Sequence, residues 1–377
     1  MIIYNSMIVW IVVLGIWNKL TMQNRWKTQR FAQKQRDYKV PMYLAVLTFG
    51  YIIFWVGMRS GVADTRAYIS MFESQSTSLS AIPQYWEFSE NKSPGFVTFN
   101  ILFKHFISTD YHVWLMTIAI LSGVPIMLIL RKKSEHFFYS SFLFMTGIIF
   151  FWMLNGMRQF WAATIVFLFS DWIEERKTIP FIIVVLLAST IHFTVLVMIP
   201  MYFIAIAKPF GKKVMIFLML LLLAVVFLEP FVGAMEDVLS ETAYSGSTEQ
   251  FAQDDGVNPI RVLVMAVPPV IAFWGRKILE RKENTFINIC INMSVICAGI
   301  YFLGIFTSGI LVGRLPIYFE IYNMILLPYL LKECFAEESS KIMFVLCTIG
   351  FLGFYYLQMK NSYYVSEFTG ILSGWRG

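Results

Sequence analysis

Residues 112–133 read HVWLMTIAILSGVPIMLILRKK, and this stretch decides the fold class. The first part, residues 112–130, contains no Asp, Glu, Lys or Arg, and Arg131, Lys132 and Lys133 follow it directly. An apolar run of about 20 residues is the length at which an α-helix crosses the hydrocarbon core of a bilayer. Basic residues gather at the cytoplasmic ends of such helices. The stretch therefore predicts a transmembrane helix that runs toward the cytoplasm.

The composition extends this reading to the whole chain. Of the 377 residues, 58% are hydrophobic and only 14% are charged, whereas soluble domains contain about 25% charged residues. The net charge of +6 does not indicate a nucleic-acid partner, because the basic residues are distributed between the apolar runs. We predict an all-α, polytopic helical membrane protein that forms a single multi-span domain over residues 1–377, with the first run retained as a span.

Charge asymmetry sets the predicted topology. Basic residues cluster in six connections, which the positive-inside rule assigns to the cytoplasm: 19–39, 131–133, 176–177, 208–213, 276–282 and 332–341. Residues 233–257 contain six acidic residues and no basic one, so they form a predicted outer loop, as do residues 58–111. About ten full crossings result: 2–18, 40–57, 112–130, 137–154, 157–173, 214–232, 258–274, 285–306, 315–331 and 342–358.

Two apolar segments do not fit as ordinary spans. Residues 94–107 lie between an outer loop and a span that also begins outside, so we expect a short re-entrant or interfacial helix. Residues 179–207 join two cytoplasmic loops, and each limb of about 14 residues is shorter than the bilayer core. We expect a helical hairpin with His192 at its tip; two full but thin, tilted spans are the alternative.

Six basic residues remain at the predicted outer face, and five of them are arginines: Arg59, Arg66, Lys92, Arg158, Arg261 and Arg314. Arginine suits planar, bidentate binding of phosphate and carboxylate groups. These residues predict an anionic ligand at the outer leaflet. Arg59 and Arg314 have a second interpretation, in which they reach lipid phosphates, and Arg261 has another as a helix-start ion pair.

Carboxylates and a histidine complete the candidate site. Asp64 is placed to cap a short helix, and Glu90 is placed to pair with Lys92 in a loop. Glu320 lies inside a span, where a carboxylate is expected to face a cavity or an arginine. His192 suits general-base chemistry near neutral pH, with Glu90 and Glu320 as the alternative bases. A histidine between helices is also a common structural hydrogen-bond donor.

Motifs for metal-dependent or nucleotide-dependent chemistry are missing from the sequence. It contains no Asp-x-Asp pair of the kind that binds a nucleotide sugar, no phosphate-binding loop and no His-Glu-x-x-His. We therefore expect no metal and no cofactor. A glycosyl donor would arrive already activated, as a lipid-linked sugar diphosphate does, with arginines neutralising its charge.

Four local patterns resemble the EpsG family of Wzy-type exopolysaccharide polymerases. They are RSGVADTRAYISMF (59–72), NKSPGF (91–96), NGMRQFWAATIVFLF (155–169) and ASTIHFTVLVMIP (188–200), with a weaker fifth in GRLPIYFEIYNMILLPYLL (313–331). The family commonly has adjoining glycine and aspartate in the first pattern, where this chain has Val62-Ala63-Asp64.

The resemblance implies a GT-C-like polymerase that joins undecaprenyl-diphosphate-linked oligosaccharides on the outer side of the bacterial cytoplasmic membrane, by inverting transfer without a metal. The implied partners are this lipid-linked substrate, membrane lipid, a chain-length regulator and a flippase, with no nucleic acid. The implied roles involve seven residues: diphosphate binding for Arg59, Arg66, Arg158 and Arg314, general base for His192, and orientation of sugar hydroxyls for Tyr68 and Gln159.

Two other classes share part of this pattern. A ligase performs the same transfer to a different acceptor and usually carries a larger outer loop than residues 233–257. A flippase or transporter of lipid-linked sugars needs no general base, and inverted repeats would favour it; the sequence shows none.

Overall fold

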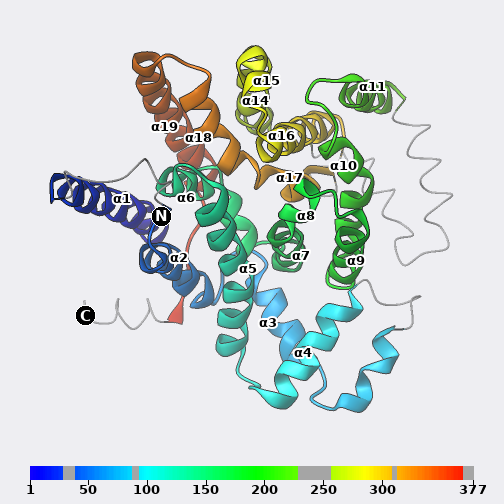
Figure 1. The fold of residues 1–377 in the computed structure, drawn as a ribbon. Coiled ribbons are helices and arrows are strands. Elements are labelled where there is room, and N and C mark those ends of the chain that lie inside the picture. Colours follow the sequence, from blue (N-terminus) through cyan, green and yellow to red (C-terminus); the bar gives the residue numbers. More distant parts are fainter. Residues whose placement is uncertain (29–38, 87–92, 228–255, 308–311, 368–377) are drawn as a thin grey trace.

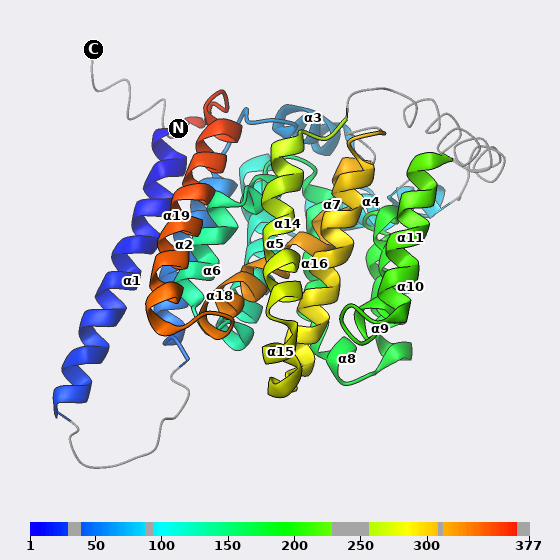
Figure 2. The same cartoon turned by 90° about the horizontal axis from the view of Figure 1, so that it is seen from above.

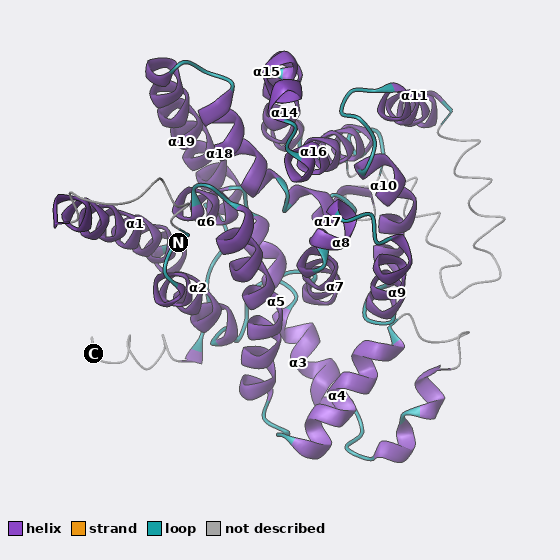
Figure 3. Cartoon of the chain, in the orientation of Figure 1, coloured by secondary structure: helices purple, strands orange, loops and turns teal. Residues whose placement is uncertain are grey.

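The computed structural model describes residues 1–28, 39–86, 93–227, 256–307 and 312–367. Within these ranges every regular element is a helix, which confirms the all-α prediction (Figure 3). Helices are expected here because apolar runs in a bilayer have to satisfy their backbone hydrogen bonds internally.

The helices and 3-10 turns follow one another in this order: α1 (Ile2–Thr28), α2 (Met42–Gly57), α3 (Thr65–Ser74), η1 (Leu79–Ala81), η2 (Pro83–Trp86), α4 (Pro94–Phe106), α5 (Tyr111–Lys133), α6 (Phe137–Thr146), η3 (Ile149–Met153), α7 (Met157–Leu168), α8 (Ser170–Glu174), α9 (Thr178–Ser189), η4 (Phe193–Val197), α10 (Met198–Ala205), α11 (Lys212–Val226), α14 (Pro259–Trp274), α15 (Arg276–Lys282), α16 (Thr285–Leu303), η5 (Val312–Arg314), α17 (Ile317–Glu320), α18 (Asn323–Glu333) and α19 (Glu337–Met359). Polar caps begin several of the long helices. The Asp110 carboxylate accepts from the amide of His112 at α5, and Asn258 and Asn284 cap α14 and α16 in the same way.

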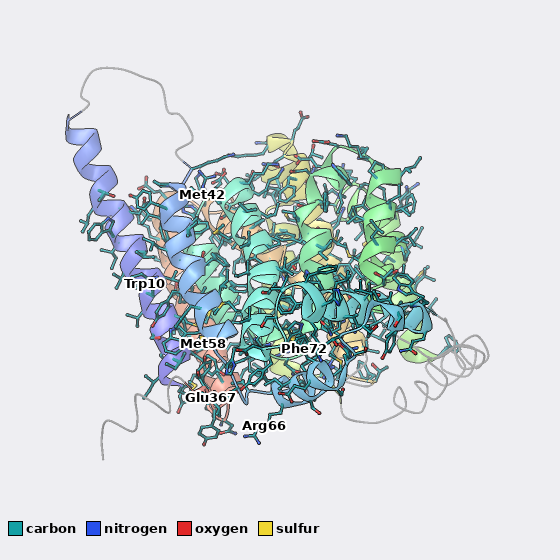
Figure 4. The ribbon with its side chains drawn as sticks, turned by 90° about the horizontal axis from the view of Figure 1, so that it is seen from below. Trp10, Met42, Met58, Arg66, Phe72 and Glu367 are labelled. Carbon is teal, nitrogen blue, oxygen red and sulfur yellow. The ribbon has the colours of Figure 1, made fainter. Side chains whose placement is uncertain are left out.

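Most helices stand side by side, so the bundle has two ends (Figure 2). One end, which we call the α3 end, holds α3, the start of α14 and the end of α19. The opposite end, the α15 end, holds α8 and α15. The described parts of the predicted outer loops lie at the α3 end, and the described parts of the basic connections lie at the α15 end. Helices α3 and α4 lie across the bundle direction (Figures 1 and 4).

The structure does not confirm the predicted number of ten crossings. Among the described residues, four helices are long and apolar enough to cross a membrane: Ile2–Thr21, Tyr111–Lys133, Thr285–Leu303 and Glu337–Met359. A fifth arises if α14 and α15, which meet at a bend of 71°, count as one span. These helices agree with a membrane-embedded protein.

Several predicted spans are interrupted. The predicted span 137–154 breaks after Thr146, where Ile148 adopts a left-handed backbone with φ 67°, an unfavourable conformation for a β-branched residue. The predicted span 315–331 is divided into α17 and α18. Hydropathy alone does not reveal such breaks, because the residues on both sides of each one are apolar.

The two unusual segments are helical where the sequence predicts them. Residues 94–107 form α4, which lies across the bundle as an interfacial helix would, rather than along it. The predicted hairpin breaks between Ser189 and Phe193, so His192 lies at the break between α9 and η4.

Ion pairs link the connections at the α15 end. Lys133 bonds to Asp171 at 2.7 Å and to Glu174 at 2.5 Å, which joins α5 to α8. Lys332 lies 2.6 Å from Glu135 and joins α18 to the loop before α6. The basic residues that orient the chain thus also connect its helices.

At the α3 end the chain after α19 folds back over the end of α2. The Tyr364 hydroxyl donates to the Trp55 carbonyl at 2.6 Å, and the Val365 carbonyl accepts from the Ser60 amide at 2.9 Å. The Glu367 carboxylate accepts from the Tyr111 hydroxyl at 2.7 Å. We call residues 360–367 the C-terminal strap; Figure 4 shows Glu367 on the same side as Met58.

Candidate functional site

Arg158, which lies in the largely apolar pattern 155–169, is positioned by the start of α7. Gly156 precedes the helix with φ +73°, a left-handed conformation that glycine adopts without strain. The chain therefore turns sharply into α7, and Arg158 and Gln159 fall in the first helical turn. Met157 and Trp161 anchor this turn in a buried cluster with Phe96 and Trp114.

Arg158 is half-buried among aromatic rings. Its Cζ lies 5.6 Å from the centre of the Tyr68 ring and 5.8 Å from that of Phe96. Its Nη1 lies 3.5 Å from Ser93 Oγ, a long contact. Its Nε is buried and has no hydrogen-bond partner within the described part of the chain. A buried donor without a partner is costly, so this guanidinium is suited to an anionic ligand.

Helix α4 docks directly on the break that carries His192. The Gly95 amide donates to the Thr190 carbonyl at 2.8 Å. A Cβ at position 95 would lie 2.1 Å from Thr190 Oγ1, which is too close for any side chain. The NKSPGF and ASTIHF patterns therefore meet, and glycine permits the contact.

Gln159 joins α7 to two other segments. Its Nε2 lies 3.1 Å from Thr194 Oγ1 and 3.1 Å from the Arg314 carbonyl oxygen. A carbonyl only accepts, so the amide nitrogen has to face it. Gln159 is 3% exposed and holds η4 and η5 together.

His192 lies at the centre of this network. Its Nδ1 is 2.9 Å from Thr194 Oγ1, and that oxygen is 2.8 Å from the Tyr318 hydroxyl. Arg158 and Arg314 both act electrostatically on the imidazole. We call the group formed by the following residues the Arg158–His192 cluster: Arg158, Gln159, His192, Thr194, Arg314 and Tyr318.

The sequence predicts four members of the cluster and misses Thr194 and Tyr318. Both missed residues lie inside quoted patterns: Thr194 is two positions after His192, and Tyr318 is two positions before Glu320. A hydroxyl on an apolar segment is a weak signal, because most such groups bond to their own helix.

Arg59 is not part of this cluster. It is fully buried, and it donates to Thr65 Oγ1 at 3.0 Å, to the Val56 carbonyl at 2.6 Å and to Met157 Sδ at 3.2 Å. Burial lowers the pKa of Arg59 to about 10, so the side chain stays charged at neutral pH. Its contacts tie α2, α3 and α7 together.

The remaining residues of the first pattern have different environments. Tyr68 is 8% exposed and faces Arg158. Arg66 is exposed and points away from the bundle (Figure 4). Asp64 lies at the N-cap position of α3, but its side chain makes no capping hydrogen bond.

Glu320 is buried in a separate polar group. Its carboxylate accepts from Trp152 Nε1 at 2.6 Å and from the Tyr301 hydroxyl at 2.7 Å. Arg261 lies close to this group, with its Cζ 5.9 Å from the centre of the Tyr301 ring. Glu320 therefore links η3, α16 and α17.

Three predictions fall wholly or mostly outside the described residues. Glu90 and Lys92 lie in 87–92, and most of the acidic loop 233–257 lies in 228–255.

The cluster lies within a region that matches a known family. The family model described as "EpsG family" matches residues 42–369. The chain belongs to the EpsG family. This is a family of Wzy-type exopolysaccharide polymerases, so membership implies a membrane-embedded polymerase with glycosyltransferase-like activity. Among curated proteins and solved structures, no match to the chain was found.

Proposed function

We propose that this EpsG-family protein joins undecaprenyl-diphosphate-linked oligosaccharide repeat units into exopolysaccharide on the outer side of the bacterial cytoplasmic membrane. The observation that carries the proposal is the Arg158–His192 cluster. Hydrogen bonds join the segments that carry Arg158, His192 and Arg314, which are far apart in sequence. Arg158 also faces Tyr68 of α3, and α3 lies at the end of the bundle that charge asymmetry predicts to be outside.

Arg158 is the proposed ligand of the diphosphate on the donor chain. Its unpartnered Nε and weakly bonded Nη1 leave donors for phosphate oxygens. The first turn of α7, where it sits, adds the positive end of a helix dipole. Arg314 supplies the second positive charge. Together they stabilise the diphosphate as the bond to the sugar breaks.

His192 is the proposed general base. When Nδ1 carries the ring hydrogen and donates it to Thr194, 2.9 Å away, Nε2 can take the proton of the acceptor sugar hydroxyl. As that oxygen attacks the anomeric carbon, the carbon–oxygen bond to the diphosphate breaks and the electron pair leaves with the phosphate. A single displacement of this kind inverts the anomeric configuration. A positioned general base typically contributes about 100- to 10,000-fold in rate.

The test is elongation of a lipid-linked repeat by the purified protein in detergent, where no membrane gradient exists. The expected result is a ladder of longer lipid-linked glycans. A protein that only moves the lipid across a bilayer gives no ladder, and that outcome would overturn the proposal.

The same assay tests the base with His192→Ala. We expect loss of the ladder with retained binding of the lipid-linked repeat. His105→Ala is the matched control, because His105 is an exposed histidine whose ring bonds to the Thr77 carbonyl. If His192→Ala elongates as the control does, His192 is not the base.

A further inference from the structure

The Thr194 hydroxyl is the meeting point of three hydrogen-bonding groups. Gln159 Nε2 lies 3.1 Å, His192 Nδ1 2.9 Å and the Tyr318 hydroxyl 2.8 Å from its oxygen. A threonine hydroxyl offers one hydrogen and two lone pairs. Three partners use this capacity completely, so the direction of any one bond restricts the other two.

The bond from Gln159 has a fixed direction. The same nitrogen bonds to the Arg314 carbonyl oxygen, which has no hydrogen to give. The amide nitrogen therefore faces both oxygens and donates to Thr194. One lone pair of the threonine oxygen is thereby occupied.

Two arrangements of the other bonds remain. In the first, His192 Nδ1–H donates to Thr194, and the threonine hydrogen points to Tyr318. In the second, the Tyr318 hydroxyl donates to Thr194, and the threonine hydrogen points to Nδ1. The neutral ring then carries its hydrogen on Nε2 and has no lone pair there. Only the first arrangement leaves Nε2 able to accept a proton.

The choice of tautomer matters because a general base has to be a neutral ring with a free lone pair. A neutral imidazole has one hydrogen, and which nitrogen carries it follows from the bond that the other nitrogen makes.

We infer that Thr194 and Tyr318 are positioning residues that hold His192 in the tautomer with its hydrogen on Nδ1, an inference that rests on the proposed role of His192 as the base. Thr194 acts by accepting that hydrogen, and Tyr318 acts by accepting from Thr194. Tyr318 is 2% exposed, which suits a role exerted through its neighbour and not on the substrate.

The tautomer can be measured without activity. The chain has four histidines, so ¹⁵N-histidine labelling gives four imidazoles, and the His192→Gln variant identifies the signals of residue 192. We expect the wild-type protein and Thr194→Ser to carry the hydrogen on Nδ1. Thr194→Val and Tyr318→Phe are expected to move it toward Nε2. A wild-type ring protonated on Nε2, or a Thr194→Val spectrum identical to wild type, would overturn the inference.

Kinetics give a second readout. We call the chain of hydrogen bonds from Tyr318 through Thr194 to His192 the relay. Tyr318→Phe removes one of these bonds and is expected to lower kcat roughly tenfold, with KM for the lipid-linked repeat unchanged. Tyr322→Phe is the matched control, because Tyr322 is also fully buried but its hydroxyl has no hydrogen-bond partner in the described part of the chain. Equal kcat values for the two variants would contradict the role of Tyr318.

The two proposals fail in different ways. If His192→Gln polymerises at the wild-type rate, the base assignment fails, and with it the relay's catalytic role. If His192→Gln is inactive while Thr194→Val keeps both the wild-type tautomer and the wild-type kcat, the base assignment stands and the relay fails.

Discussion

Arg59 and Arg158 are both arginines at the α3 end, both within sequence patterns of the EpsG family, but their surroundings are opposite. Arg59 is fully buried, and three protein atoms accept its hydrogen bonds. Arg158 is half-buried, its Nε has no described partner, and its remaining polar contact is long. The two residues are linked through Met157, which contacts Arg59 and precedes Arg158.

This difference separates two uses of a charge near a membrane. The donors of Arg59 are already engaged by the protein, so the residue fixes the geometry of α2, α3 and α7. The Nε donor of Arg158 is buried without a described partner, which supports the proposed role of Arg158 in binding the diphosphate. Four tests can break or sharpen this contrast.

The largest expected effect is on stability. Arg59→Ala removes one of the largest fully buried side chains and takes a donor from the Thr65 hydroxyl and the Val56 carbonyl, at a cost of about 1–3 kcal/mol for each group. We expect a clear fall in the free energy of unfolding, measured by denaturation in detergent. Arg66→Ala, an exposed change seven residues away in the same pattern, should stay within about 0.5 kcal/mol. Equal free energies of unfolding for the two variants would contradict the structural role of Arg59.

The next effect is on rate and not on stability. Arg158→Lys keeps the charge but loses the two-pronged geometry, so we expect elongation to fall about 100- to 1,000-fold, or 2.7–4 kcal/mol. Unfolding should be unchanged. Arg176→Lys, an exposed change at the α15 end, is the control. A fully active Arg158→Lys variant would make Arg158 an interfacial anchor.

A smaller effect concerns the contact between α4 and the His192 break. Gly95→Ala forces a methyl group into Thr190 Oγ1 and Cβ, and overpacking of this kind typically costs about 1–3 kcal/mol. Thermal unfolding measures the cost. Gly50→Ala is the control, because nothing lies within 4 Å of a Cβ there; in mid-helix it should stabilise by about 0.5–1 kcal/mol. Equal changes in both variants would mean that α4 shifts freely.

The smallest expected effect is the pH dependence of the stability that the C-terminal strap contributes. The Tyr111 hydroxyl and then His112 hold the pKa of Glu367 below its usual value, and the His112 amide does the same for Asp110. Such carboxylates contribute stability above their unfolded pKa, about 4, and this contribution is lost as pH falls through the lower folded value. We expect a small drop in melting temperature as the pH falls from about 5 to about 2. Glu367→Gln should reduce the drop, and an unchanged drop would contradict this account.

Much of the fold follows from the sequence because its signals are local. The apolar run 112–130 followed by three basic residues is a helix in the structure, and the short limbs of 179–207 correctly indicate a break at Ser189–His192. The breaks within 137–154 and 315–331 were missed, because they depend on how apolar residues pack against other helices. That information is not present in hydropathy.

The site was predictable in its residue types more than in its contacts. The sequence treats the arginines of the predicted outer face as one class, and it does not show that Arg59 is satisfied by Thr65 and Met157 while Arg158 Nε is not. The sequence predicts that Glu320 faces a cavity or an arginine, and it does not show that Trp152 and Tyr301 donate to its carboxylate. These distinctions depend on side-chain partners that are distant in sequence.

The C-terminal strap also has a consequence for the order in which the protein is made. Trp55 and Tyr364 are 309 residues apart along the chain, yet their hydrogen bond joins the C-terminal strap to the end of α2, close to Arg59. During synthesis α2 emerges long before residues 360–367, so this contact cannot form until the last helix has been made. Because contacts between distant residues form late, the neighbourhood of Arg59 is among the last parts of the protein to mature. A nascent chain that stops after α19 would carry every residue of the Arg158–His192 cluster without this contact.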